Sequence, residues 1–158
     1  MSLKRSTILG AVASVVMLAS TLVALAAGEP GQWVTASSPH SVAETTKRLE
    51  EAIEKAGATL FATIDHQANA SAAGLDLSPV TLVIFGNPNV GTPLMQANPA
   101  AGLDLPVRVL IWEEDGETRL GALAPDELKA RYGLTEADEA LAKMKGALDK
   151  LMAAASAE

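Results

Sequence analysis

The chain has 158 residues, contains no cysteine and carries a formal net charge of −7. Without cysteine it cannot form disulfides, thiolate metal sites or a cysteine nucleophile. The acidic balance argues against general binding to nucleic acid or to anionic lipid, because both need a basic surface.

The N-terminus has the pattern of a secretory signal peptide. Lys4 and Arg5 precede an apolar run from Ile8 to Leu25, and Ala24-Leu25-Ala26 offers small residues at a cleavage site. We predict cleavage after Ala26 and a periplasmic or secreted product that no longer contacts the membrane. A retained anchor is the alternative, although the run is slightly shorter than the roughly 20 residues that span a bilayer.

The rest of the chain fits one domain of common size. We divide it into an N-terminal segment at 27–40, a core at 41–134 and an amphipathic C-terminal helix at 135–158. The first strand is predicted at 32–37, inside the N-terminal segment.

A helix is predicted to follow. Ser41 and Glu44 have the spacing of a capping box, and Gly57 can adopt the left-handed conformation that ends a helix.

Four further strands are predicted from apolar runs and alternation, at residues 60–65, 80–85, 107–112 and 118–123. In the first of these, Leu60, Ala62 and Ile64 are expected on one face. Glu113 to Glu117 is predicted to join the last two strands as a hairpin with a left-handed glycine.

Helices complete the chain. Gly86 to Asn89 is predicted as a turn, with Thr92 as the N-cap of a short helix that begins at Pro93. Thr135 is predicted to cap the last helix. The apolar stripe of that helix is Ala137, Leu141, Met144, Leu148, Leu151 and Ala155, and it could dock on the sheet or on a second subunit. The order of elements predicts an α+β fold with a mainly antiparallel sheet.

Several segments together carry a family resemblance. They are Ile64-Asp65-His66, Ala73-Gly74-Leu75, Thr81 to Pro88, Gly91 to Gln96, Gly102 to Pro106 and Trp112-Glu113. In this order and spacing the chain resembles the bacterial domain-of-unknown-function family number 302, from about Ser41 to Leu134. The resemblance implies a β-α-β-β-β-β-α arrangement of TATA-binding-protein-like architecture and a homodimer, and it supplies no catalytic residues. Relatives often have Arg-His-Gly where this chain has Arg131-Tyr132-Gly133.

Asp65 and His66 are the candidate catalytic pair. A carboxylate beside an imidazole can fix the imidazole's tautomer and raise its basicity. The alternative is a histidine that satisfies backbone groups at a turn.

His66, Asn87, Thr92 and Trp112 are the candidate binding residues. Asn87 and Thr92 lie in a glycine- and asparagine-rich stretch before a helix, where a small anion could bind, although a turn that serves the fold explains the stretch better. Metal-ligand spacing is missing around His66, so we predict no metal and no cofactor.

Three functions remain open. The first is a domain that binds a small molecule or a partner, since no nucleophile and base stand in a recognisable pattern. The second is an enzyme that uses Asp65 and His66 as acid or base. The third is a structural homodimer without a ligand.

Overall fold

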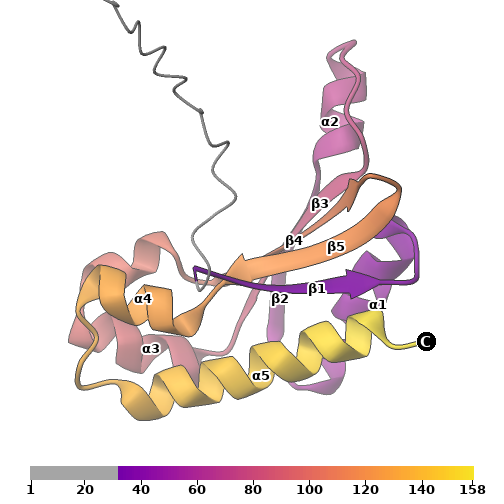
Figure 1. Cartoon of the computed structure of the whole chain (residues 1–158). Coiled ribbons are helices and arrows are strands. Elements are labelled where there is room, and N and C mark those ends of the chain that lie inside the picture. The colour runs from indigo at the N-terminus through magenta and orange to yellow at the C-terminus, as the bar shows by residue number, and fades with distance from the viewer. Residues whose placement is uncertain (1–31) are drawn as a thin grey trace, which may run out of the picture.

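The computed structural model describes residues 32–158, so the predicted signal peptide at 1–26 lies outside the described residues. The strands are β1 (Trp33–Ser38), β2 (Thr59–Asp65), β3 (Val80–Gly86), β4 (Val107–Glu114) and β5 (Glu117–Leu123). They form one antiparallel sheet in the order β1-β5-β4-β3-β2 (Figure 1). The predicted α+β fold with an antiparallel sheet is therefore confirmed.

The helices are α1 (Val42–Lys55), α2 (His66–Ala72), α3 (Pro88–Ala97), α4 (Pro125–Tyr132) and α5 (Asp138–Ser156), with a short 3-10 helix η1 (Pro99–Leu103). Within residues 32–158, no helix has the length and apolar character needed to cross a membrane.

Helix α1 begins and ends as the sequence predicts. The Ser41 side chain accepts a hydrogen bond from the Glu44 backbone N–H, which satisfies one of the free donors at the helix start. Gly57 follows the helix with a φ of +67°, a conformation that costs glycine little. The predicted hairpin also forms, with Gly116 at a φ of +79°.

The main core lies between the sheet and two helices. Helices α1 and α5 pack against each other and against the same face of the sheet (Figure 1). Leu49 and Ile53 of α1 meet Leu148 and Leu151 of α5 there, over buried side chains of β3, β4 and β5. The apolar stripe of the last helix therefore docks on the protein's own sheet.

The opposite face of the sheet has no helix packed on it among the described residues. Its side chains alternate with the buried ones and are only half-buried: Val80, Leu82 and Ile84 of β3, and Leu110 and Trp112 of β4. We call these five residues the open sheet face.

Trp112 packs closely on its own sheet. A Cβ atom added at Gly121 would lie 3.1 Å from the Trp112 ring, so the glycine leaves the space that the indole fills.

Two helix starts differ from the sequence prediction. Helix α3 begins five residues early, because Asn87 is the N-cap and accepts from Asn89 N–H, with Pro88 in the first turn. Pro93 lies inside the helix, and the prediction of Thr92 as N-cap is wrong. Both prolines follow a capping residue, so local rules favour each start equally.

The last helix begins at Asp138, after Ala137, which forms no side-chain cap. The prediction of Thr135 as its cap is therefore wrong. The burial of Ala137 and of Leu134 before it shows that packing decides this boundary.

Strand β2 contains an irregularity that alternation did not predict. The register shifts between Leu60 and Ala62, which leaves Phe61 as an extra residue. Leu60 pairs with Phe85, whereas Ala62 pairs with Ile84 of the open sheet face. Leu60 therefore does not share a face with Ala62 and Ile64, and that prediction is wrong.

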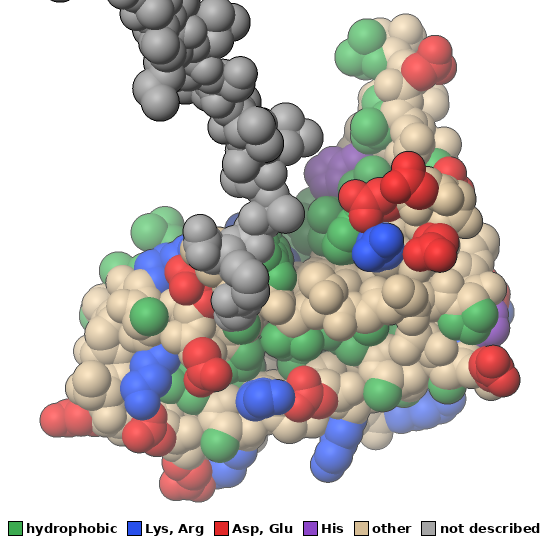
Figure 2. Space-filling model, in the orientation of Figure 1, with side chains coloured by type: hydrophobic (Ala, Val, Ile, Leu, Met, Phe, Trp, Pro, Cys, Tyr) green, Lys and Arg blue, Asp and Glu red, His purple; other side chains and the backbone are tan. Residues whose placement is uncertain are grey.

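Helix α2 projects from the sheet (Figure 1). None of its residues is buried, and Leu75 and Leu77 after it are 64% and 42% exposed. Hydrophobic side chains gather at the base of this projection (Figure 2).

Candidate functional site

An apolar pocket of about 320 Å³ opens between α5, α3 and one end of the sheet. Its walls include Phe61, Phe85, Val90, Met95, Met144 and Leu148. None of the described residues that line it carries a charge. Its size falls within the range of small-molecule sites, which are mostly apolar with a few placed polar groups.

Asn87 and Thr92 supply the polar side chains of this pocket. The structure thus brings two of the four predicted binding residues together, on the first turns of α3. The Asn87 carboxamide oxygen accepts a hydrogen bond from the Asn89 backbone N–H at 2.9 Å, while the Thr92 side chain is exposed. The backbone donors of Val90 and Gly91 bond to the Asn87 carbonyl, so this helix start offers no cluster of free donors for an anion.

His66 and Trp112 lie at the other end of the sheet. Asp65 pairs with Thr81 and Trp112 with Val80 at the start of β3, whereas the pocket adjoins its last residue, Gly86. Six residues of extended chain separate the two ends, or about 20 Å. The four predicted binding residues therefore do not form one site.

Asp65 has a structural task. It is the N-cap of α2, and its Oδ1 accepts from the Ala68 backbone N–H at 2.8 Å. His66 is the first residue of that helix and is half-buried. Among the described hydrogen bonds none joins Asp65 to His66, so the carboxylate orients the helix start and not the imidazole.

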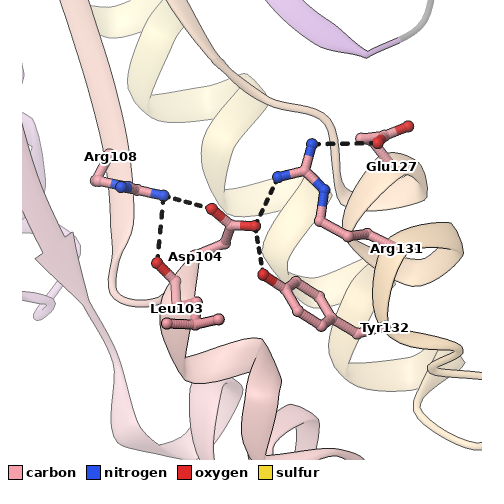
Figure 3. Close-up of polar contacts among 6 residues, drawn as sticks. All are labelled: Leu103, Asp104, Arg108, Glu127, Arg131 and Tyr132. Carbon is pink, nitrogen blue, oxygen red and sulfur yellow. Dashed lines mark hydrogen bonds and ion pairs between the residues drawn. The ribbon is translucent and has the colours of Figure 1, made fainter.

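The structure assembles a polar cluster that the sequence did not reveal. Asp104, after η1, accepts from Arg131 Nη1 at 2.8 Å and from the Tyr132 hydroxyl at 2.7 Å, both on Oδ2 (Figure 3). Its Oδ1 accepts from Arg108 of β4. Arg131 also contacts Glu127 at 3.3 Å. The Asp104 side chain is only 11% exposed. Its contacts with Arg108, Arg131 and Tyr132 link η1 and β4 to α4.

The charge state of this cluster follows from its contacts. Burial alone would raise the pKa of Asp104, but the hydrogen bonds from Tyr132 and Arg131 and the charges of Arg131 and Arg108 outweigh it and hold that pKa below its ordinary value. The hydrogen bond to Asp104, together with burial, raises the pKa of the Tyr132 hydroxyl. The ionised Asp104 and the neutral Tyr132 are thus the stable forms.

Asp104 stands in one of the segments that carry the family resemblance, and Tyr132 is the position where relatives often have histidine. Asp104 and Tyr132 lie 28 residues apart in the chain, so no local motif relates them. Their positions in the family pattern were the sequence signal that drew attention to both. No group of three or more acidic, histidine or cysteine side chains is arranged to hold a metal ion in the range 32–158.

The sequence pattern of the family described as "Domain of unknown function DUF302" matches residues 34–151. The chain belongs to this family. The pocket, the open sheet face and most of α5 all fall within the matched residues, so the DUF302 domain includes the C-terminal helix almost to its end.

A solved DUF302 structure has the same fold. The uncharacterized conserved protein DUF302 from Bacillus stearothermophilus superimposes with a TM-score of 0.70 at 22% identity, covering 78% of this chain and 97% of that one.

Curated relatives are longer proteins. The chain is 46% identical over 102 residues to the fluoride-specific ion channel FluC 1 of Brucella suis and to FluC 2 of Brucella melitensis. The match covers 64% of this chain but only 40% and 38% of those proteins. The DUF302 chain thus spans about two-fifths of these relatives, and the channel activity in their names belongs to the whole proteins.

Proposed function

We propose that this DUF302 domain binds a small, largely apolar molecule in the pocket between α3 and α5. The observation that carries the proposal is an uncharged pocket of about 320 Å³ whose walls include Phe85, Leu148 and Leu151 of the main core. At about 30 Å³ per water molecule, that volume corresponds to roughly ten waters, which an apolar ligand would displace favourably.

A blocking substitution tests this proposal. Ala147 is an exposed residue of α5 that lines the pocket, so Ala147→Phe would place a ring at the opening without disturbing buried side chains. Binding of the neutral fluorophore N-phenyl-1-naphthylamine should be saturable in the wild type. We expect Ala147→Phe to weaken it at least about tenfold, equivalent to a loss of about 1.4 kcal/mol.

Ala142→Phe is the matched control, because Ala142 is exposed on the same helix but outside the pocket. This variant should bind the fluorophore as the wild type does. Equal affinity of the wild type and Ala147→Phe, or no saturable binding at all, would refute the pocket proposal.

We infer a homodimer as a second candidate function, with the open sheet face as its contact surface. The five side chains of that face are apolar, while Arg108, opposite Ile84, and Arg119, opposite Trp112, lie on the same side of the sheet. Two copies of an acidic chain repel each other, so a face whose central side chains are apolar is the surface on which they can meet. The α2 projection supports this, because a seven-residue helix with no buried side chain gains little stability alone.

The dimer is tested by sedimentation velocity over a range of concentrations. We expect the wild type to be dimeric and Leu110→Glu, on the open sheet face, to be monomeric, since a two-fold contact places the new charge in the interface twice. Ala142→Glu, at an exposed position of α5 on the opposite side of the sheet, should stay dimeric. A wild-type monomer at all concentrations would contradict the inference.

Export is a further proposal that rests on the N-terminal pattern of Lys4, Arg5 and the apolar run after them. Support would come from an intact mass that begins at Ala27 in protein recovered from the periplasm. A mass that retains residue 1 would refute cleavage after Ala26.

A further inference from the structure

We propose that the molecule in the apolar pocket is neutral and carries a carbonyl oxygen, which accepts a hydrogen bond from the side-chain amide of Asn87. This inference rests on the pocket proposal and adds the chemical class of the ligand, which is an apolar ketone, ester or amide. It follows from the orientation in which the structure holds this lining side chain.

Asn87 is oriented by the helix that it caps. Its Oδ1 accepts a hydrogen bond from the Asn89 backbone N–H at 2.9 Å, and only the oxygen branch of a carboxamide can accept it. The nitrogen branch, Nδ2, is therefore the part of the side chain that remains for other contacts. Asn87 is half-buried and lines the pocket, yet within residues 32–158 its Nδ2 donates no hydrogen bond to the protein. Its N–H groups are thus left to water or to a ligand.

A ligand that fills the pocket takes water away from this amide. A half-buried donor that loses its water and gains no acceptor costs free energy. A pure hydrocarbon incurs that cost, whereas a ligand with a carbonyl oxygen beside Asn87 replaces the lost hydrogen bond. The hydroxyl of Thr92, which also lines the pocket, can donate or accept and does not select between the two classes. Nδ2 can only donate, so it selects a ligand that accepts.

The uncharged walls favour a neutral acceptor over an anionic one. None of the described lining residues is arginine, lysine or histidine, so a carboxylate buried in the pocket would have no cationic partner. Pro88 and Pro106 also line the pocket and have no backbone N–H to donate. The Asn87 amide therefore supplies hydrogen bonds without a full charge, which suits a carbonyl group.

Two probes of nearly equal size isolate the carbonyl group: 2-acetylnaphthalene and 2-ethylnaphthalene, each used to displace N-phenyl-1-naphthylamine. They differ by a C=O group in place of a CH₂ group. The measured quantity is the ratio of the ketone's affinity to the hydrocarbon's, compared between protein variants so that the different solubilities of the probes cancel. We expect Asn87→Ser to lower this ratio roughly three- to tenfold, as suits the loss of one hydrogen bond.

The variants are chosen to keep the start of α3 intact. Serine caps helices about as well as asparagine, so Asn87→Ser removes the amide N–H groups and retains a cap. Asn87→Asp also retains the cap, replaces the donor by a carboxylate oxygen and should lower the ratio at least as much. The matched control is Asn89→Ser, because Asn89 is exposed on the same turn but outside the pocket. This control should leave the ratio unchanged.

The outcomes distinguish the two proposals. If 2-ethylnaphthalene displaces the fluorophore but neither Asn87 variant lowers the ratio, or Asn89→Ser lowers it equally, the carbonyl inference is overturned and the apolar pocket stands. Tighter binding of 2-naphthoate than of 2-acetylnaphthalene would overturn the neutral class. If neither 2-acetylnaphthalene nor 2-ethylnaphthalene displaces the fluorophore, both proposals fall.

Discussion

Replacing Leu49 by alanine is expected to lower the free energy of unfolding by about 2–5 kcal/mol, the range for buried leucines. Leu49 is fully buried at the centre of the contact between α1, α5 and the sheet, where it packs with Ile53 and Leu148. The variant leaves a cavity that rigid strands on one side cannot close. Urea unfolding followed by circular dichroism measures the change.

The matched control is Leu103→Ala, at a side chain that is 78% exposed. Its free energy of unfolding should stay within about 0.5 kcal/mol of the wild type, as for most surface substitutions. Equal losses in the two variants would mean that α1 and α5 do not pack on the sheet as the structure has them.

Asp104→Ala is expected to cost about 1–2 kcal/mol of stability, because Arg108, Arg131 and Tyr132 all lose their common acceptor. The loss stays moderate since both guanidinium groups are nearly half exposed and water screens them. Asp76→Ala, at an exposed aspartate outside this cluster, should have little effect.

The same cluster predicts a pH dependence. The pKa of Asp104 is lowered in the folded state, so its stabilising contribution is complete above the unfolded value of about 3.9 and is lost as pH falls through the lower folded value. Tyr132 has a raised pKa, so its contribution is present below about pH 10 and is lost as pH rises through the folded value.

Urea unfolding at a series of pH values tests both the predicted loss of stability at low pH and the predicted loss at high pH. Asp104→Asn should flatten the loss of stability below about pH 4, and Tyr132→Phe should flatten the loss above about pH 10. Curves for these variants that run parallel to the wild type at both extremes would show that the cluster does not stabilise the fold.

Much of the fold could be predicted because the deciding interactions are local. The Ser41 cap, the left-handed Gly57 and the Asp115-Gly116 hairpin depend on residues within a few positions of one another. The order of strands and helices follows from hydrophobic periodicity in the same way.

The candidate site was only partly predictable. Asn87 and Thr92 were selected for a loop before a helix, and they do lie together in the pocket, although the helix starts at Pro88 and therefore includes Thr92. The walls of the pocket come from α3, α5 and three strands, and no local pattern relates these segments. For the same reason, Asp104 and Tyr132 could be paired only in three dimensions.

The sequence by itself determined the elements, their order, the antiparallel class of the sheet and the buried stripe of α5, because capping, turn chemistry and periodicity act over a few residues. Tertiary structure alone decided which of two prolines starts α3, where β2 bulges at Phe61 and that α5 covers the protein's own sheet. Those outcomes depend on packing between segments far apart in the chain. The pocket arises from the same packing, since it is a space left between elements.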